Sequence, residues 1–359
     1  MFFFSRKEEK TSSLDTDNVT AFVTPDFDDL AAMREVEIQR LKWNSFLASH
    51  RNTSIWDESW LWMNRTEHNP DVGPIRKKLM LLFNSKVKTR KQVKSLVRHG
   101  VPPELRGKVW FACSGAPLKM KTATPEESYA TLVNQIPTLE GSQIAVDIEK
   151  DLPRTFPDYI GNDKEIPTEV LRRVLLAYAL RNPSVGYCQS MNYVCALLLL
   201  HMKEEKAFWV FSALIEDILP PDYYSPSMLG GRIDQHVFQA CVAWKLPRLY
   251  AKFKETSTLL EPIICPWFLC LFINVLPLYT VCRVWDCLFW EGSAVVFRIG
   301  LSMLRSKQDI LLHSNDFVSI YTVLKAGNKG YSFELEPVPN ASATPSLSPS
   351  TSHVEGTTL

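Results

Sequence analysis

The stretch "PTEVLRRVLLAYALRNPSVGYCQSMNYVCALLLLHM", residues 167–202, decides the fold. Two segments rich in apolar residues flank "RNPSVG" (181–186), whose proline and glycine interrupt a helix. The first segment is expected to begin at Thr168, because threonine is favoured at the N-cap of a helix. The second is strongly apolar. The stretch therefore predicts two helices joined by a short loop.

The same pattern continues on both sides of this stretch. It predicts helices over 29–48, from Glu104 onward, over 125–135 and 142–152, and through most of 206–325. Few segments alternate apolar and polar residues with the period of a strand, and no repeat of fixed length is seen. We therefore expect an all-α fold.

Composition divides the chain further. Residues 1–28 are polar and acidic and are expected to be flexible, and 29–94 to form an N-terminal helical extension with a basic stretch. A large helical domain is expected over 95–325. The end, 335–359, is rich in proline, serine and threonine, which predicts a disordered tail.

Charge and cysteine content exclude several classes of protein. The chain of 359 residues has 40 Lys and Arg against 39 Asp and Glu, so we expect no nucleic-acid partner recruited by net charge. The first residues lack the apolar core of a secretory signal, which indicates an intracellular, cytoplasmic protein. The 8 cysteines form no CxxC pair, so we interpret them as reduced core thiols and expect no metal site.

Two segments could contact a membrane. Residues 263–281, "IICPWFLCLFINVLPLYTV", are long enough to cross a bilayer, but Pro266 and Pro277 favour a buried central helix flanked by proline breaks. The basic stretch 76–98 could bind phosphate or anionic lipid, whereas an amphipathic helix pair with a solvated basic face is the commoner structure.

The sequence has no GxxxxGK[ST], GxGxxG, HExxH or GxSxG motif, so it does not indicate a phosphate-binding loop, a dinucleotide site, a zinc protease or the commonest hydrolase site. The remaining candidate residues for catalysis lie in two polar clusters. In "IEKDLPRTFPDY" (148–159), Arg154 lies between two prolines and three residues after Asp151. A carboxylate at that distance can hold a guanidinium in one orientation. In "GYCQSMNY" (186–193), Gln189 lies where a loop enters the apolar helix.

Taken singly, Arg154 is an ordinary surface or capping arginine and Gln189 a helix-start amide. Together they fit one reaction. GTP hydrolysis by a small GTPase is limited by charge developing on the phosphate oxygens and by the orientation of the attacking water. An arginine supplied by another protein can stabilise the charge on the phosphate oxygens and is worth about 10³ to 10⁵ in rate. An amide can orient the attacking water.

Three motifs, "RGKVW" (106–110), "IEKDLPRTFP" (148–157) and "GYCQSMNY", resemble in order and spacing the R-x-x-x-W, I-x-x-D-x-x-R and Y-x-Q signatures of the TBC family of Rab GTPase-activating proteins. Residues 261–304 look like the second half of the same domain, with its P-W-F and R-x-W-D segments. The resemblance covers about 95–320 and implies a TBC domain of two helical subdomains.

The resemblance also assigns roles. It implies that Arg154 is an arginine finger and Gln189 a glutamine finger, both inserted into a GTP-bound Rab. Asp151 would brace the arginine. The residues expected to hold the loops in place are Ile148, Tyr187, Arg106 and Trp110. Ser190 departs from the glycine common after the family's glutamine, a change that could perturb the turn that aims Gln189.

Several alternatives stay open at this point. The chain could instead be a non-catalytic effector that binds a GTP-loaded Rab, or a scaffold. The resemblance implies no cofactor of its own, because GTP and Mg²⁺ belong to the partner. Membrane contact would be indirect, through the lipidated Rab on endomembranes, with or without help from 76–98. The sequence does not indicate which Rab is the substrate, which organelle is involved or how many copies assemble.

Overall fold

The computed structural model describes residues 30–49, 84–161, 164 and 166–325. Within these ranges the regular structure is helical, apart from an isolated bridge between Ile160 and Ile166. The all-α fold class is thereby confirmed. The predicted flexible segment 1–28 and the predicted tail 335–359 lie outside the described residues, and the domain boundaries stay predictions.

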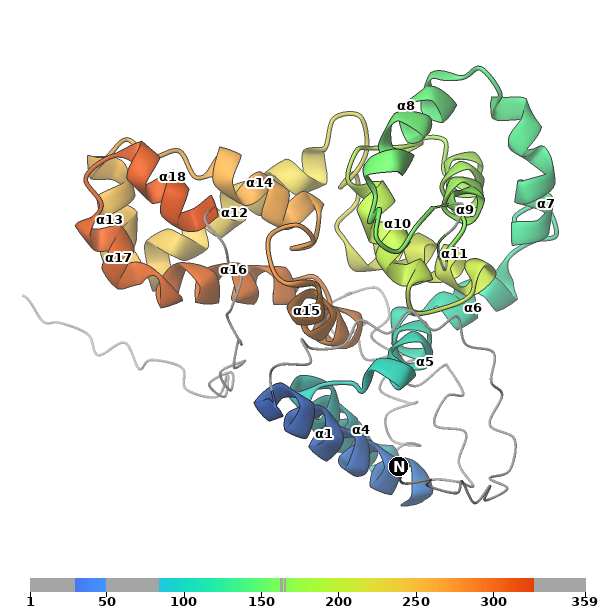
Figure 1. Cartoon of the computed structure of the whole chain (residues 1–359), viewed down its shortest axis with the longest axis horizontal. Helices are drawn as coiled ribbons and strands as arrows, with labels where there is room; N and C mark the ends of the chain where they lie inside the picture. Colours follow the sequence, from blue (N-terminus) through green and yellow to red (C-terminus); the bar gives the residue numbers. More distant parts are fainter. Residues whose placement is uncertain (1–29, 50–83, 162–163, 165, 326–359) are drawn as a thin grey trace, which may run out of the picture.

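One group of helices contains residues 167–202 and lies at the right of Figure 1. It comprises α6 Ala116–Thr122, α7 Tyr129–Gln135, α8 Gln143–Asp151, α9 Thr168–Arg181, α10 Met191–Leu199 and α11 Glu204–Ala213, with the 3-10 turns η3 Ile136–Leu139 and η4 Leu152–Arg154 and the π-helical turn η5 Leu214–Ile218. Every residue of α10 except Tyr193 is buried. Its nearly uniform apolar sequence suits this central position between α9 and α11.

A second group follows in the chain, at the left of Figure 1. It comprises α12 Leu229–Lys245, α13 Pro247–Glu255, α14 Glu261–Leu269, α15 Leu278–Glu291, α16 Ala294–Ser306, α17 Gln308–His313 and α18 Phe317–Lys325. Helix α12 packs against α13, α14 and α16. The two groups confirm the expected pair of helical subdomains.

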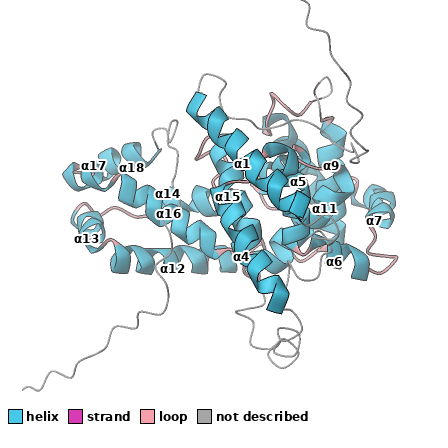
Figure 2. Ribbon diagram, turned by 90° about the horizontal axis from the view of Figure 1, so that it is seen from below, coloured by secondary structure: helices cyan, strands magenta, loops and turns pink. Residues whose placement is uncertain are grey.

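Helix α15 belongs to the second group but lies near the centre of Figure 1, where it packs against α4 Asn84–His99 and α5 Pro103–Ser114. Helix α4 packs in turn against α1 Leu30–Ser49. Figure 2 shows α1, α4 and α15 close together in the second view. The Trp43 indole of α1 donates to the Gly100 carbonyl at 2.9 Å, and the Arg98 guanidinium pairs with Glu291 of α15 at 2.6 Å. The side chain of Glu291 is almost fully buried, so this ion pair helps to fix α4 on α15.

Helix α5 approaches the end of α10 very closely. A Cβ placed on Gly107 would lie 2.0 Å from the backbone oxygen of His201. Only glycine allows this approach, which explains why the "RGKVW" motif has a glycine inside a helix.

The prediction of one central helix over 263–281 is wrong. Helix α14 ends at Leu269 and α15 starts at Leu278, after Pro277. Between them Leu271, Phe272 and Asn274 have φ values of 47°, 68° and 68°, which a right-handed helix cannot accommodate. In the part of the chain that the structure describes, no helix is both long enough and apolar enough to cross a membrane.

Two other expectations need correction. Helix α9 begins at Thr168, but the cap position is occupied by Pro167, and no side chain caps the helix. Of the predicted helix pair over 76–98, the structure gives one helix, α4, and residues 76–83 lie outside the described residues. Helix α4 is amphipathic as expected, because Val93 and Val97 are buried whereas Lys91 and Lys94 are exposed.

Candidate functional site

Arg154 lies where α8 ends. The helix runs through Asp151 directly into the turn η4, which has Pro153 in its first positions and Arg154 as its last residue. Ile148 is fully buried on α8 and anchors the helix that carries Asp151. The Arg154 Nη2 donates to Asp151 Oδ1 at 2.5 Å. The side chain of Arg154 is 48% exposed, whereas that of Asp151 is 7% exposed, so a buried carboxylate holds an accessible guanidinium.

The same carboxylate also binds the second cluster. The Tyr187 hydroxyl donates to Asp151 Oδ2 at 2.5 Å. Burial and this hydrogen bond raise the pKa of Tyr187 well above its ordinary value, so the phenol stays protonated and remains a donor. Asp151 therefore ties the arginine loop to the loop that carries Gln189, two residues after Tyr187.

A second connection joins the two loops beneath the surface. The Asn192 Nδ2 donates to Thr155 Oγ1 at 2.7 Å, and Asn192 Oδ1 accepts the Ser190 N–H at 3.1 Å. The Thr155 hydroxyl in turn donates to the Asp151 carbonyl at 2.7 Å. Thr155 and Asn192 are fully buried. This connection links the residue after Arg154 to the residue after Gln189.

Gln189 is exposed and precedes a strained residue. Ser190 has a φ of 100°, in the left-handed region that favours glycine, which costs a non-glycine residue about 1 to 3 kcal/mol. Its side chain is nearly buried, and its hydroxyl accepts from the Cys270 thiol at 3.2 Å. Cys270 follows α14, so the second helical group also contacts the turn that presents Gln189.

Arg106 and Trp110 belong to a different cluster. The Trp110 indole donates to Asp286 Oδ1 at 2.8 Å, and the Arg106 Nε lies 3.5 Å from the same oxygen. The Val101 N–H donates to the other oxygen at 3.0 Å. Burial raises the pKa of Asp286 above its ordinary value, and the Arg106 charge opposes that rise. The structure therefore does not bring Arg106 and Trp110 to the loops of Arg154 and Gln189. It uses them to join α5 to α15.

Sequence reasoning missed Thr155, Asn192 and Tyr193. The Tyr193 hydroxyl donates to the Arg154 carbonyl at 3.2 Å, which adds a third contact between the loops. A signal for Asn192 did exist, because it is a polar residue in the first turn of an otherwise apolar helix. Thr155 had no such signal, since a threonine between Arg154 and Phe156 is unremarkable in a loop.

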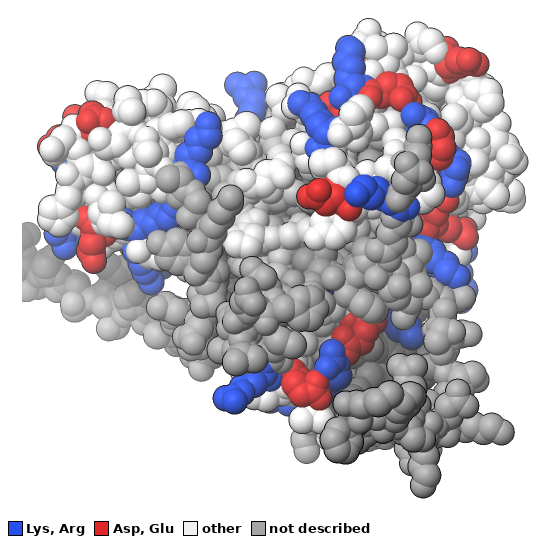
Figure 3. Space-filling model, viewed as in Figure 1, with Lys and Arg blue, Asp and Glu red and all other residues white. Residues whose placement is uncertain are grey.

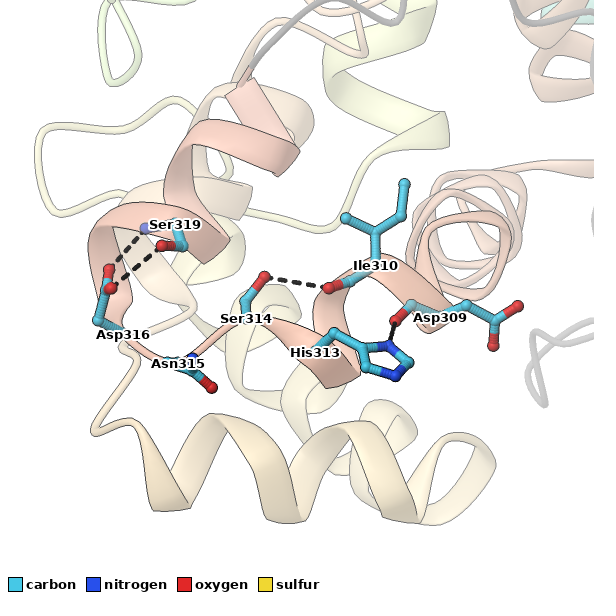
Figure 4. Close-up of a pocket in the computed structure, with 7 residues that line it drawn as sticks. All are labelled: Asp309, Ile310, His313, Ser314, Asn315, Asp316 and Ser319. Atoms are coloured by element: carbon cyan, nitrogen blue, oxygen red, sulfur yellow. Dashed lines mark hydrogen bonds between the residues drawn. The ribbon is translucent and has the colours of Figure 1, made fainter.

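An open pocket of about 590 Å³ lies elsewhere, at α17 and the turn into α18. Figure 4 shows that three of its polar side chains bond locally: Asp316 accepts the Ser319 N–H and hydroxyl at 2.7 and 3.1 Å, and the Ser314 hydroxyl donates to the Ile310 carbonyl. These groups satisfy one another. The pocket is therefore a weaker candidate than the loops of Arg154 and Gln189.

Charge on the surface is mixed. In Figure 3, basic and acidic side chains are interspersed over the helical group at the right, and the described residues on this face form no large field of one sign. Among those residues, no group of three or more His, Cys, Asp or Glu side chains could hold a metal ion. That the chain needs no cofactor of its own stays a prediction.

Comparison with known proteins decides the family. Residues 103–312, more than half of the chain, match the model of the Rab-GTPase-TBC domain. The chain belongs to the TBC family of Rab GTPase-activating domains. The resemblance drawn from the three motifs is confirmed, and the match falls on α5 to α17.

Two curated relatives cover most of this chain. The chain is 39% identical over 260 residues to the human growth hormone-regulated TBC protein 1, covering 71% of this chain and 75% of that protein. It is 36% identical over 288 residues to small G protein signaling modulator 3 of Rattus norvegicus, covering 80% of this chain but 35% of that longer protein.

Solved structures agree on the fold. The crystal structure of a Chlamydomonas flagellar RabGAP TBC domain superposes with a TM-score of 0.58 at 33% identity, covering 70% of this chain and 85% of that domain. The Ypt/Rab-GAP domain of Gyp1p superposes with a TM-score of 0.55 at 18% identity, covering 68% and 88%. At that identity the second likeness concerns the fold alone.

Proposed function

We propose that this TBC domain accelerates GTP hydrolysis by a GTP-bound Rab-family GTPase, and that it supplies Arg154 and Gln189 to the partner's nucleotide site. One observation carries the proposal. The carboxylate of Asp151 binds Arg154 with one oxygen and Tyr187 with the other, which places an exposed arginine and an exposed glutamine on two adjoining loops.

The chemistry divides between the two side chains. The Arg154 guanidinium would stabilise negative charge that develops on the transferred phosphoryl oxygens, worth about 4 to 7 kcal/mol of barrier. The Gln189 amide carries a donor and an acceptor and would orient the attacking water. GTP and Mg²⁺ would belong to the Rab, so this chain would need no nucleotide or metal site of its own.

The remaining residues would act through these two. Asp151 and Tyr187 would orient Arg154 and join its loop to that of Gln189, and Ile148 would hold α8 in the core. Arg106 and Trp110 would contribute through the stability of the contact between α5 and α15. Membrane contact would come through the lipidated Rab.

A phosphate-release assay on a panel of GTP-loaded Rabs tests the proposal. We expect at least one Rab to be accelerated, and Arg154→Ala to reduce the acceleration by about 10³ to 10⁵. We expect Gln189→Ala to reduce it by at least about tenfold. Arg248→Ala on α13 and Gln143→Ala on α8 are matched controls, because both side chains are exposed outside the two loops, and they should leave the rate unchanged.

Two outcomes would overturn the proposal. One is that no Rab is accelerated although a GTP-loaded Rab binds, which would identify the chain as an effector. The other is that acceleration survives both Arg154→Ala and Gln189→Ala.

A further inference from the structure

We infer that Asn192 and Thr155 are positioning residues that couple the two finger loops, so that Arg154 and Gln189 move as one unit. The inference rests on the proposed function for its catalytic consequence. Its structural basis is the hydrogen-bond chain from the Ser190 N–H through Asn192 and Thr155 to the Asp151 carbonyl, with distances of 3.1, 2.7 and 2.7 Å.

The chain of hydrogen bonds has one consistent direction. The Ser190 N–H can only donate, so it fixes the Asn192 oxygen as the acceptor and leaves the amide nitrogen to donate to Thr155. The Thr155 hydroxyl then has its proton free to donate to the Asp151 carbonyl. If the Asn192 amide were flipped, its NH₂ would face another donor. Donors and acceptors therefore match only in this arrangement.

Burial makes this linkage costly to break. Asn192 and Thr155 are both fully buried, so water cannot replace a lost partner. A buried polar group left unsatisfied costs about 1 to 3 kcal/mol. Separating the two loops would leave unsatisfied buried polar groups on Asn192 and on Thr155, so the state in which the loops are hydrogen-bonded to each other is favoured.

Backbone strain occurs at one residue of the linkage and beside another. Ser190 has a φ of 100° and Phe156, next to Thr155, has a φ of 44°. Strained residues persist only where the surroundings fix them. Tyr193 contributes on the arginine side, since its ring packs edge-on against Phe156 with centroids 5.8 Å apart and its hydroxyl donates to the Arg154 carbonyl.

The coupling has a specific kinetic consequence. Thr155 follows Arg154 and Ser190 follows Gln189, so the linkage sets the distance between the two fingers at the backbone. A misplacement of about 1 Å in a catalytic group can cost about 10²-fold in rate. Docking of a GTPase on the surrounding surface does not depend on this distance. Loss of the linkage should therefore lower kcat and change KM little.

Thr155→Val is the sharpest variant, because valine keeps the shape of threonine and removes the hydroxyl. We expect it to lower kcat with an accelerated Rab by about 10- to 100-fold, with KM within about threefold. Thr155→Ser should restore most of the rate. The double variant Thr155→Val with Asn192→Ala should be no slower than Asn192→Ala alone, since both break one linkage.

Hydrogen exchange gives a readout that needs no GTPase. We expect Thr155→Val, a change in the arginine loop, to speed exchange of the Ser190 amide in the glutamine loop. The matched control is Ser212→Ala in α11, which also removes a buried hydroxyl that donates to a carbonyl, that of Phe208, at 2.8 Å. This control should leave both kcat and the exchange of Ser190 unchanged.

Three results would overturn the inference: a rise in KM at constant kcat, additive losses in the double variant, or unchanged exchange at Ser190 in Thr155→Val. If the wild type accelerates no Rab, the proposed function fails by itself, and the exchange measurement still decides whether the loops are coupled.

Discussion

The molecule contains the same ion pair, arginine with aspartate, in two opposite settings. Arg106 and Asp286 are both 0% exposed and join α5 to α15. Arg154 pairs with the nearly buried Asp151, but its own side chain is 48% exposed. Both arginines occur in signature motifs of the TBC family, so the motif alone does not separate their roles.

Burial separates them. The Arg106 charge is compensated inside the protein, by Asp286 and by the Tyr279 ring 5.3 Å from the guanidinium carbon. Because the Arg106 side chain is fully buried, it cannot contact another protein. Arg154 has one bond to Asp151 and a face open to solvent, so the aspartate sets its orientation while the charge stays available. The two arginines thus differ in exposure and not in chemistry.

The largest expected effect is a loss of activity with little change in stability. Arg154→Ala should reduce Rab GTPase acceleration by about 10³ to 10⁵, because its guanidinium would contact the developing phosphate charge. The free energy of unfolding should change by about 1 kcal/mol at most, because the Asp151 carboxylate keeps its Tyr187 partner and water can enter the space left by the half-exposed guanidinium. Phosphate release and urea unfolding on the same sample check both. A comparable loss of stability would make Arg154 a structural residue like Arg106.

Asp286→Ala should show the reverse pattern. It removes the partner of Arg106, Trp110 and the Val101 N–H at once and leaves a buried cation, so we expect the free energy of unfolding to fall by about 3 to 5 kcal/mol. Urea unfolding followed by tryptophan fluorescence measures this. A loss below about 1 kcal/mol would mean that the buried cluster is not needed to hold α5 on α15.

Tyr187→Phe should have a moderate effect on the finger loops. It removes only the hydroxyl that bonds Asp151, worth about 1 to 3 kcal/mol for a charged acceptor. We expect kcat to fall by about tenfold while KM changes little. Tyr159→Phe, at an exposed tyrosine in the same arginine loop, is the matched control and should leave kcat unchanged. Equal losses in the two variants would contradict a special role for Tyr187.

The smallest effect concerns an aspartate whose pKa is raised by burial alone. Burial raises the pKa of Asp234 on α12 to about 6 from 3.8. The native state then holds this proton more tightly than the unfolded state, so stability falls as pH rises from about 4 to about 6. Asp234→Asn should therefore be more stable than the wild type at pH 7, by about 1 to 2 kcal/mol, and equal to it near pH 4. Thermal unfolding at both pH values tests this, and a stability difference independent of pH would contradict it.

The sequence predicted contacts and helices that depend on residues close together in the chain. Asp151 and Arg154 are three residues apart and do form the expected pair, and the helices of 167–202 follow from their apolar pattern and from the loop between them. The remaining contacts join distant residues. Tyr187 lies 36 residues from Asp151, Asn192 lies 37 from Thr155 and Trp110 lies 176 from Asp286. The periodicity of apolar residues in the sequence does not predict such pairs, because only the packing of the helices brings them together.

The same limit explains the errors in the helix predictions. Apolar content over 263–281 indicated one continuous helix, but a buried turn can be as apolar as a buried helix. Leu271 and Phe272 adopt left-handed backbone conformations, which their residue types do not predict. Arg106 and Trp110 were expected to hold the loops in place, and that role stays a prediction; the structure shows that both side chains bond Asp286 where α5 packs on α15.

The most direct test of the central claim uses a Rab whose own water-orienting glutamine has been replaced by alanine. If Gln189 supplies the amide, the wild-type TBC domain should still accelerate GTP hydrolysis by this Rab, and Gln189→Ala should abolish the acceleration. Single-turnover phosphate release measures both. Loss of acceleration with the wild-type TBC domain, while the altered Rab still binds it, would contradict the claim that this chain provides the second catalytic finger.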